Sequence, residues 1–354
     1  MSALPAPAVD GRASEELVQL APDYPSWRDF VARTPEATVF HLPAWTQVIA
    51  DTYRYPAAVL AAVEAGRVVA GVPVVRARRL RGPAWVSLPF SDHSPPLAVD
   101  PPTLAAFSSA LARWSERGGL PLEVRGEVPP GPGWRPDPAG ARHVLALETD
   151  VDRQWRRVRA RDRQYIKVAG RGLRVRFGRS AGDVDVFYRL HVHTRRRQGV
   201  PVQPRRFVRA VADRMLGAGH GVVAVAETPA GEAVAAAVLL AWNGTAILKW
   251  LASDARRWDL RANHVLMWES VRWAVEGGNR VYDLGKSEAE QRGLHQFKEG
   301  FGARRLPLVH SLAGGPSSAA GGHRRAGDAL ALVIRRSPTI VCRTLGLLLY
   351  RYAA

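Results

Sequence analysis

Two aspartates stand where the sequence could place a proton acceptor. Asp92 lies in the loop SDHSPP, directly before His93, and Asp283 lies in the apolar segment YDLG. A partly buried carboxylate can take a proton from an incoming amine or hold that amine, because burial raises its pKa. We expect Asp92 to act as a general base and Asp283 to orient the amine. The alternatives are a turn cap for Asp92 and an ion pair with an arginine for Asp283.

A run of arginines offers a binding surface for phosphate groups. Arg195, Arg197 and Gln198 belong to the segment TRRRQG, which follows a short amphipathic stretch. Arginine side chains bind phosphate through two parallel hydrogen bonds, so this run predicts an anion-binding site. A basic surface without a ligand is the alternative.

A second phosphate site is expected where the segment LRAN (260–263) leads into a helix. We expect Asn263 to cap this helix and Arg261 to lie beside its free backbone N–H groups, which suit a phosphate or pyrophosphate. An ordinary capped helix without a ligand is the alternative.

Two of the four lysines are further candidates for binding a substrate. Lys298 precedes Gly300-Phe301-Gly302 at an expected helix end, where an exposed ammonium can meet a phosphate or neutralise the helix dipole. Lys249 lies between Leu248 and Trp250 in an expected strand. It faces either a cleft or, as the simpler alternative, the outer face of the sheet.

Nucleophiles and metal ligands are sparse in this sequence. Cys342 is the one cysteine, which excludes an intramolecular disulfide and fits a reducing compartment, and no GxSxG motif is present. His191 and His193 stand two residues apart without a third ordered ligand, so we expect helical or core histidines and no metal site.

The elements that position these residues occur twice in the chain. Three segments of the first half recur in the same order in the second, with the offset falling from 165 to 159 residues: 64–75 and 229–240, 82–92 and 244–254, 113–126 and 272–285. This predicts that residues 64–126 and 229–285 form the same strand–strand–helix–strand unit. Asp254, the repeat partner of Asp92, is expected to cap a turn.

The pattern within each copy indicates the fold class. In the second copy, three apolar runs split by TPAGE and NG predict an antiparallel meander, followed by a helix ending at Gly277-Gly278, a short strand and a helix over 290–299. The first copy repeats the helix stripe and its Gly-Gly end. This order predicts an α+β fold with a mixed α/β sheet.

Several segments of the chain resemble one known protein family. YDLGKSEAEQRGLHQFKEGFGARRLPL (282–308) resembles the C-terminal signature of FemAB-like proteins, the peptidoglycan-bridge aminoacyltransferases and their acetyltransferase-like relatives. Four further segments are similar to the family: HLPAWTQVI (41–49), SLPFSDH (87–93), TRRRQGVP (194–201) and LRANHVLMWESVRWA (260–274). SLPFSDH and TRRRQG look more like the acetyltransferase-like branch.

The resemblance implies two tandem GNAT-like acyltransferase domains. The expected divisions are a disordered N-terminus (1–20), a first domain (21–140), a second domain (141–312) and a basic amphipathic tail (313–354). It also implies contact between Lys298 and a substrate phosphate.

The implied activity is an N-acyltransferase that acts in cell-wall (peptidoglycan) biogenesis. An acyl or aminoacyl group would pass from acyl-CoA or aminoacyl-tRNA, a co-substrate and not a bound cofactor, to an amine of a muropeptide or amino sugar. The partners would be a small or lipid-linked envelope precursor and, for the second donor, tRNA.

Composition leaves other classes open. The chain has 354 residues, 47% of them apolar, and a formal net charge of +18. Residues 153–179 hold 11 basic residues and one acid, so an RNA- or polyanion-binding protein is an alternative. A membrane-associated, non-catalytic protein that retains the fold is another.

The last segment, 329–352, is apolar, basic and free of acids. It fits helices lying on an anionic bilayer, or a terminal helix pair packed on the body of the protein, which we favour. No signal peptide or spanning segment is expected, which predicts a cytoplasmic protein with peripheral contact at the inner membrane face.

Overall fold

The computed structural model describes residues 16–80, 82–314 and 324–352. The elements of the first half are β1 (Val18–Leu20), α1 (Pro25–Arg33), α2 (Pro43–Tyr53), β2 (Ala57–Glu64), β3 (Arg67–Ala77), β4 (Ala84–Val86), β5 (Leu97–Ala98), α3 (Pro101–Gly118) and β6 (Leu122–Val124). Those that follow are β7 (Trp134–Ala146), α4 (Val151–Arg157), α5 (Ala160–Gly172), β8 (Arg174–Gly178), α6 (Ala181–Gln198), α7 (Arg205–Val211), β9 (Gly221–Glu227), β10 (Ala233–Trp242), β11 (Thr245–Ser253), α8 (Ala262–Glu276), β12 (Val281–Ser287), α9 (Arg292–Gly300), β13 (Arg304–Ala313), α10 (Arg324–Arg336) and α11 (Thr339–Leu349).

The duplication predicted from the sequence is present in the topology. In the first copy β2, β3 and β4 are antiparallel, and β6 then pairs with β4 in parallel after the helix α3. In the second copy β9, β10 and β11 are antiparallel, and β12 pairs with β11 in parallel after α8. The α+β class and the repeated strand–strand–helix–strand unit are therefore confirmed.

Local sequence explains the turns of these units. Asn243 and Gly244 join β10 to β11 with φ of 51° and 76°, the backbone that a two-residue hairpin requires. The helix α3 ends at Gly119, which has a φ of 65°. Gly277 is the C-cap of α8, as expected.

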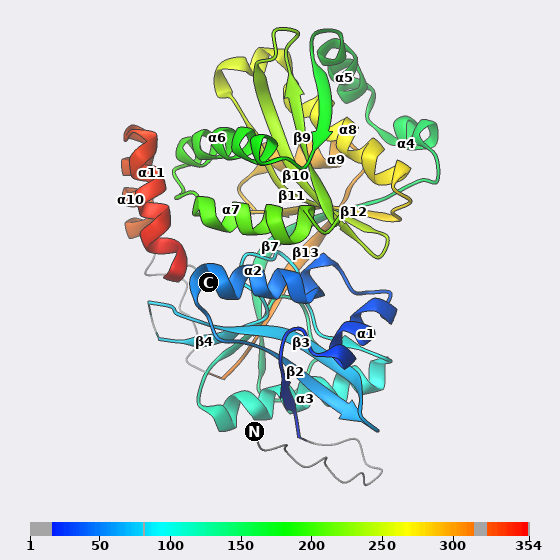
Figure 1. Cartoon of the computed structure of the whole chain (residues 1–354), viewed down its shortest axis with the longest axis vertical. Helices are drawn as coiled ribbons and strands as arrows, with labels where there is room; N and C mark the ends of the chain where they lie inside the picture. Colours follow the sequence, from blue (N-terminus) through cyan, green and yellow to red (C-terminus); the bar gives the residue numbers. More distant parts are fainter. Residues whose placement is uncertain (1–15, 81, 315–323, 353–354) are drawn as a thin grey trace.

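The two copies join into one sheet through the strands β7 and β13. The strand order is β1-β2-β3-β4-β6-β13-β7-β12-β11-β10-β9-β8, with β5 beside β3. β13, the last strand among the described residues, lies between β6 of the first copy and β7 (Figure 1). The division expected at residue 140 falls inside β7 and stays a prediction.

Helices cover the sheet of the second copy on both faces. α6 packs on one face of β10 and β11, and α8 packs on the opposite face (Figure 1). The core under α6 continues into the first half, where Trp45 meets Phe207 with ring centroids 6.2 Å apart. This shared core fixes the first copy against the second next to the end of β11.

The C-terminal helices α10 and α11 pack against α6 at one edge of the molecule (Figure 1). Ile334, Cys342 and Tyr350 are buried in the large core beneath them. The favoured interpretation of the tail, a helix pair on the body, is thus confirmed for residues 324–352. None of the helices in the described part of the chain has the length and hydropathy needed to cross a bilayer.

Candidate active site

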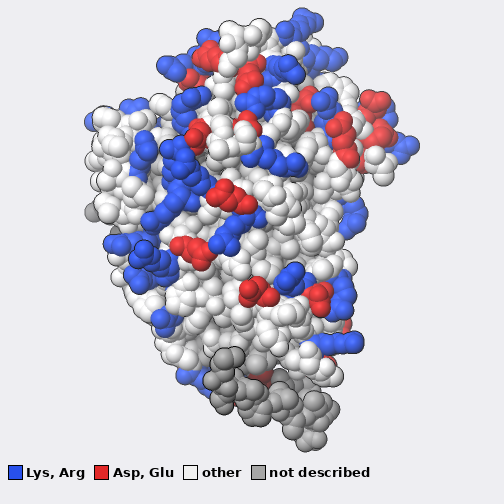
Figure 2. Space-filling view, viewed as in Figure 1, with Lys and Arg blue, Asp and Glu red and all other residues white. Residues whose placement is uncertain are grey.

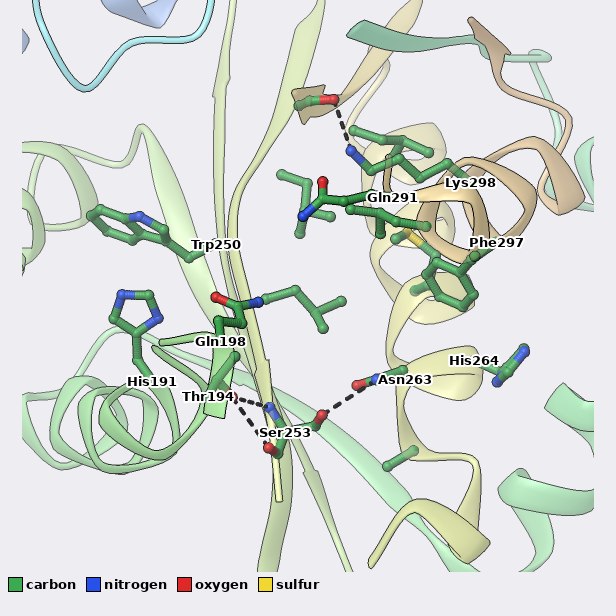
Figure 3. Close-up of a pocket in the computed structure, with 18 of the residues that line it drawn as sticks. His191, Thr194, Gln198, Trp250, Ser253, Asn263, His264, Gln291, Phe297 and Lys298 are labelled. Atoms are coloured by element: carbon green, nitrogen blue, oxygen red, sulfur yellow. Dashed lines mark hydrogen bonds between the residues drawn. The ribbon is translucent and has the colours of Figure 1, made fainter. Parts of the chain in front are cut away.

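The site begins where two parallel strands separate. β11 and β12 pair only at their first three positions, from Thr245–Val281 to Ile247–Asp283. Beyond this point both strands line a cavity of about 950 Å³, together with residues of α6, α8 and α9. Figure 3 shows α6 residues on one side of β11 and residues of α8 and α9 on the other.

Asp92 reaches this cavity from the first copy. Its Oδ2 accepts a hydrogen bond from the backbone N–H of Lys286 on β12, at 3.1 Å. Its field also acts on the ammonium groups of Lys249 and Lys298. Among the described residues of the first half, only Asp92 lines the cavity. Its position fits that of the predicted general base, and this role stays a prediction.

Asp283 forms the ion pair that was its structural alternative. Its Oδ2 lies 3.3 Å from Nε of Arg142, and its Oδ1 accepts the backbone N–H of Gly285 at 2.8 Å. Burial raises the pKa of this carboxyl, and Arg142 and the Gly285 N–H oppose that shift. Both carboxylate oxygens of Asp283 are occupied, and Asp283 does not line the cavity. These contacts favour a structural role for Asp283 in β12 over the predicted contact with a substrate amine.

Lys249 does not lie on the outer face of the sheet, so the simpler alternative was wrong. Its ammonium is buried, donates a hydrogen bond to the carbonyl of Phe90, and lies 5.2–5.3 Å from the ring centroids of Phe40, Trp45 and Trp250. Burial lowers the pKa of this ammonium. The aromatic faces and the carbonyl offset the desolvation of the charge.

Lys298 is not the exposed helix lysine that the sequence suggested. It is 4% exposed, and its Nζ donates to the carbonyls of Gly285 (2.8 Å) and Lys286 (3.0 Å) and to Oγ of Ser287 (2.9 Å). All three N–H bonds of the ammonium are therefore used inside the protein. Burial lowers its pKa to about 8. Lys298 therefore stabilises the end of β12 that has separated from β11. Its predicted contact with a phosphate is disfavoured by these three hydrogen bonds and stays a prediction.

Arg197 and Asn263 lie on the two sides of Ser253 at the end of β11. The guanidinium of Arg197 donates to the Ser253 carbonyl at 3.2 Å and lies 4.8 Å from the ring centroid of Trp258. The amide of Asn263 donates to Oγ of Ser253 at 3.3 Å (Figure 3). Its buried Oδ1 has no hydrogen-bond partner among the described residues. Both residues line the cavity.

Arg195 and Gln198 complete the α6 wall of the cavity. Arg195 is tied to the C-terminal segment, because it donates to the Pro201 carbonyl at 3.2 Å and to the Tyr350 hydroxyl at 2.9 Å. Gln198 and Trp250 both line the cavity (Figure 3). The structure thus brings the arginine run to the cleft, although Arg196 turns away and bonds the Ser337 carbonyl.

Arg261, and not Asn263, is the residue that starts α8. It has a left-handed φ of 54° and makes no side-chain cap, whereas Asn263 lies inside the helix, so the capping role expected for Asn263 was wrong. Arg261 lies 4.6 Å from the ring centroid of Tyr165. The start of α8 therefore faces the cavity without a capping side chain, which suits an anion.

Several cavity residues escaped the sequence analysis. Thr194 Oγ1 exchanges hydrogen bonds with the Ser253 backbone at 3.1–3.2 Å, and Arg257 and Trp258 form the rim. His191 is buried as expected and also lines the cavity, with Nε2 3.0 Å from Oε1 of Gln203. Arg257 and Trp258 lie in the polar loop directly before the segment LRAN. Their closeness in sequence to this predicted phosphate site was the signal that could have identified them.

Asp254 has the role expected of it. Its side chain accepts the backbone N–H of Arg256 at 3.0 Å and caps the short helical segment Ala255–Leu260. In the part of the chain that the structure describes, no group of three or more His, Cys, Asp or Glu side chains is arranged to hold a metal ion.

Comparison with protein families decides the class of this site. Residues 152–299 match the family model described as acetyltransferase (GNAT) domain. This segment is similar to a GNAT acetyltransferase domain. It contains β11, α8, β12 and most of α9, so the match covers nearly the whole wall of the cavity. The prediction of a GNAT-superfamily acyltransferase is confirmed.

Solved structures extend the likeness to the whole fold. The structure named FemX is 14% identical, with a TM-score of 0.65, and covers 84% of this chain and 96% of its own. A tandem GNAT protein from the clavulanic acid biosynthesis pathway is 16% identical, with a TM-score of 0.53 and coverage of 86% and 99%. The C-terminal domain of a candidate lysylphosphatidylglycerol synthetase from Agrobacterium fabrum is 13% identical, with a TM-score of 0.54 and coverage of 90% and 95%. At these identities the likeness concerns the fold, which is FemAB-like. A search of curated proteins gives no match.

Proposed function

We propose that this GNAT acyltransferase moves an acyl group from a CoA thioester to an amine, and that the donor occupies the space between β11 and β12. The observation that carries the proposal is the separation of these strands after Ile247 and Asp283, which opens the cavity beside the uncapped start of α8. A thioester needs no enzyme nucleophile; the protein has to align the reactants, accept a proton and stabilise an oxyanion.

The phosphates of the donor would lie at the cationic rim. Arg197, Arg257 and Arg261 line this end of the cavity, next to the start of α8. Arg261 forms no ion pair among the described residues, whereas Arg257 lies 3.3 Å from Glu232. Arginine side chains and free helix N–H groups together favour a pyrophosphate.

The reacting carbonyl would lie near Asp92 and Lys249. The backbone N–H groups of Gly285 and Lys286 are already bonded to carboxylates, and Lys298 has no N–H left to donate. Lys249 has a single acceptor among the described residues, the Phe90 carbonyl, so two of its N–H bonds remain for an oxyanion. Asp92 would act as the general base and take the proton of the attacking amine.

The acceptor in this proposal is an amine of a cell-envelope precursor, a muropeptide or an amino sugar, as the FemAB-like resemblance implies. An aminoacyl-tRNA donor is the second candidate. The predicted polyanion-binding run gains little support, because Arg157, Arg159 and Arg176 each pair with a carboxylate of the protein. A lipid-linked acceptor would place the protein at a membrane, through the C-terminal helices.

Isothermal titration with CoA, acetyl-CoA and charged tRNA tests the donor. We expect micromolar binding of CoA that Arg261→Ala weakens about tenfold, as loss of a charged hydrogen bond predicts. Mass spectrometry of amine acceptors incubated with acetyl-CoA then tests transfer. Binding of charged tRNA without binding of CoA would assign the aminoacyl donor instead.

A further inference from the structure

The outward faces of α10 and α11 are apolar. Five exposed side chains, each 47–59% exposed, lie on these two helices: Leu332, Val333, Ile340, Leu347 and Leu348. The inward faces of the same helices bury Ile334 and Cys342, and Tyr350, directly after α11, is buried as well. A terminal helix pair that packs on a protein normally turns a polar face outward, so an apolar outer face indicates a further contact.

Arginines without carboxylate partners surround this face. Arg335, Arg336, Arg343 and Arg351 are exposed, and none forms an ion pair among the described residues. In Figure 2, Lys and Arg gather over α6 and α7, beside the largely white surface at the edge where α10 and α11 lie. The surface therefore combines exposed apolar side chains with unpaired positive charge.

A second cavity opens beside α11, at the border of this surface. It measures about 230 Å³ and is lined by Asp185, Tyr188, Arg189, Val192, His193, Arg205, Thr339 and Arg343. Asp185 is neutralised by Arg205 at 2.6 Å, whereas Arg189 and Arg343 have no carboxylate partner in the described part of the chain. The cavity thus has a positive excess and adjoins Ile340 on α11, next to Thr339.

We propose that this surface docks on a bilayer of anionic phospholipids. The outward side chains of α10 and α11 enter the acyl boundary, and one lipid phosphate occupies the cavity between Arg189 and Arg343. The combination favours a membrane over a protein partner, because arginines next to apolar side chains bind the charged headgroups and the hydrocarbon of one lipid layer together. The proposal specifies the membrane contact that the proposed function gives to the C-terminal helices. It rests on that contact and is independent of the identity of the acyl donor.

Co-sedimentation of the full chain with vesicles tests this docking. We use phosphatidylcholine vesicles with and without 30 mol% phosphatidylglycerol, at about 50 and 300 mM NaCl and without any acyl donor. The expected result is binding to the anionic vesicles that weakens with salt, and little binding to phosphatidylcholine alone. Because no donor is present, failure of acyl transfer and failure of docking are separate results.

Two matched pairs of variants localise the surface. Ile340→Asp is compared with Val99→Asp, since both side chains are 59% exposed and Val99 lies far from α11 in the sequence. Arg343→Gln is compared with Arg117→Gln, an exposed arginine on α3. We expect Ile340→Asp and Arg343→Gln each to weaken binding at least about fivefold and the two controls to leave it within about twofold. Thermal unfolding confirms that all four variants fold.

Three results would overturn the proposal. The first is absence of binding to the anionic vesicles by the wild-type chain. The second is an equal loss in both members of a pair, which would indicate net charge and not this surface. The third is self-association of the wild-type chain that Ile340→Asp abolishes without any vesicle binding, which would assign the surface to a protein contact.

Discussion

The backbone N–H of Lys286 donates a hydrogen bond to Oδ2 of Asp92 at 3.1 Å, although the two residues are 194 positions apart. This bond links the loop after β4 in the first copy to the separated end of β12 in the second. The proposed base is therefore positioned by the strand that forms one wall of the donor site, and the two copies depend on each other for the chemistry.

Asp92→Asn should lower turnover about 100- to 10,000-fold while the KM for the donor changes less than about threefold. The amide can still accept the Lys286 N–H but cannot take a proton. The loss should shrink as pH rises, because more of the acceptor amine is then unprotonated. Steady-state kinetics from pH 6 to 9 measure this, with Asp137→Asn, at a half-buried position on β7, as control. Turnover within about threefold of wild type at every pH would remove Asp92 as the base.

Arg197→Ala and Arg261→Ala should each raise the Kd for CoA about tenfold, because both line the cationic end of the cavity. Arg196→Ala provides the control within the same run of arginines, since its side chain bonds the Ser337 carbonyl away from the cavity. Calorimetry gives all three constants. Equal effects at Arg196 and Arg197 would contradict a cleft-specific role.

Lys298→Met should destabilise the fold by about 2–3 kcal/mol, because it leaves the acceptors on Gly285, Lys286 and Ser287 without their donor. Urea unfolding at pH 7 measures the change. Lys286→Met, which removes a partly exposed pair with Glu288, should change stability by less than about 0.5 kcal/mol. A stable Lys298→Met protein would restore the original picture of a solvent-facing lysine.

The same lysine predicts a pH dependence with a defined sign. Burial lowers the pKa of Lys298 to about 8 in the folded chain, against an ordinary value of 10.5. Between pH 8 and 10.5 the unfolded chain therefore binds more protons, and stability rises with pH. Wild type should gain up to about 3 kcal/mol over Lys298→Met across this range. A difference in unfolding free energy between wild type and Lys298→Met that stays constant from pH 8 to 10.5 would contradict the lowered pKa of Lys298.

His41 predicts a loss of stability in acid. Its ring accepts the backbone N–H of Thr38 at Nδ1 and donates from Nε2 to the Pro95 carbonyl, each across 3.0 Å. The folded site holds the neutral ring, and burial lowers its pKa to about 4. Below pH 6.5 the unfolded chain takes up a proton that the folded chain refuses, so stability falls as the pH drops toward 4.

At pH 5 this single histidine should cost about 2 kcal/mol relative to pH 8. His41→Gln keeps an acceptor and a donor without titrating, and it should reduce the difference between urea unfolding at pH 8 and at pH 5. His193→Gln, on the exposed side of α6, is the control. An unchanged pH dependence in His41→Gln would show that another group governs acid unfolding.

The fold could be predicted from the sequence because its signals are local. The meanders, the Asn243-Gly244 turn and the helix ends at Gly119 and Gly277 each depend on a few neighbouring residues. The repeat then supplied the topology, since the same signals recur in the same order. The pairing of β13 with β6 and β7 has no such signal, because it joins segments that are far apart in the chain.

The sequence named residues that lie together, but it did not predict how their side chains are oriented. Arg195, Arg197, Gln198, Lys249, Arg261, Asn263, Lys298 and Asp92 line one cavity, whereas Asp283 does not. Whether a lysine faces solvent depends on side-chain packing. Lys249 lies in an aromatic cage, and Lys298 donates to carbonyls freed where β12 leaves β11. Such acceptors exist only after the strands have separated, so no spacing in the sequence reveals them.

The insertion of β13 between β6 and β7 has a consequence for synthesis on the ribosome. When residue 146 has been made, the edges of β6 and β7 still lack their partner strand Arg304–Ala313, so the sheet stays incomplete until that strand has left the exit tunnel. A nascent chain that stops before residue 304 exposes two unpaired strand edges, which are prone to pair with other chains. The two halves, duplicated in sequence, therefore finish folding together and late.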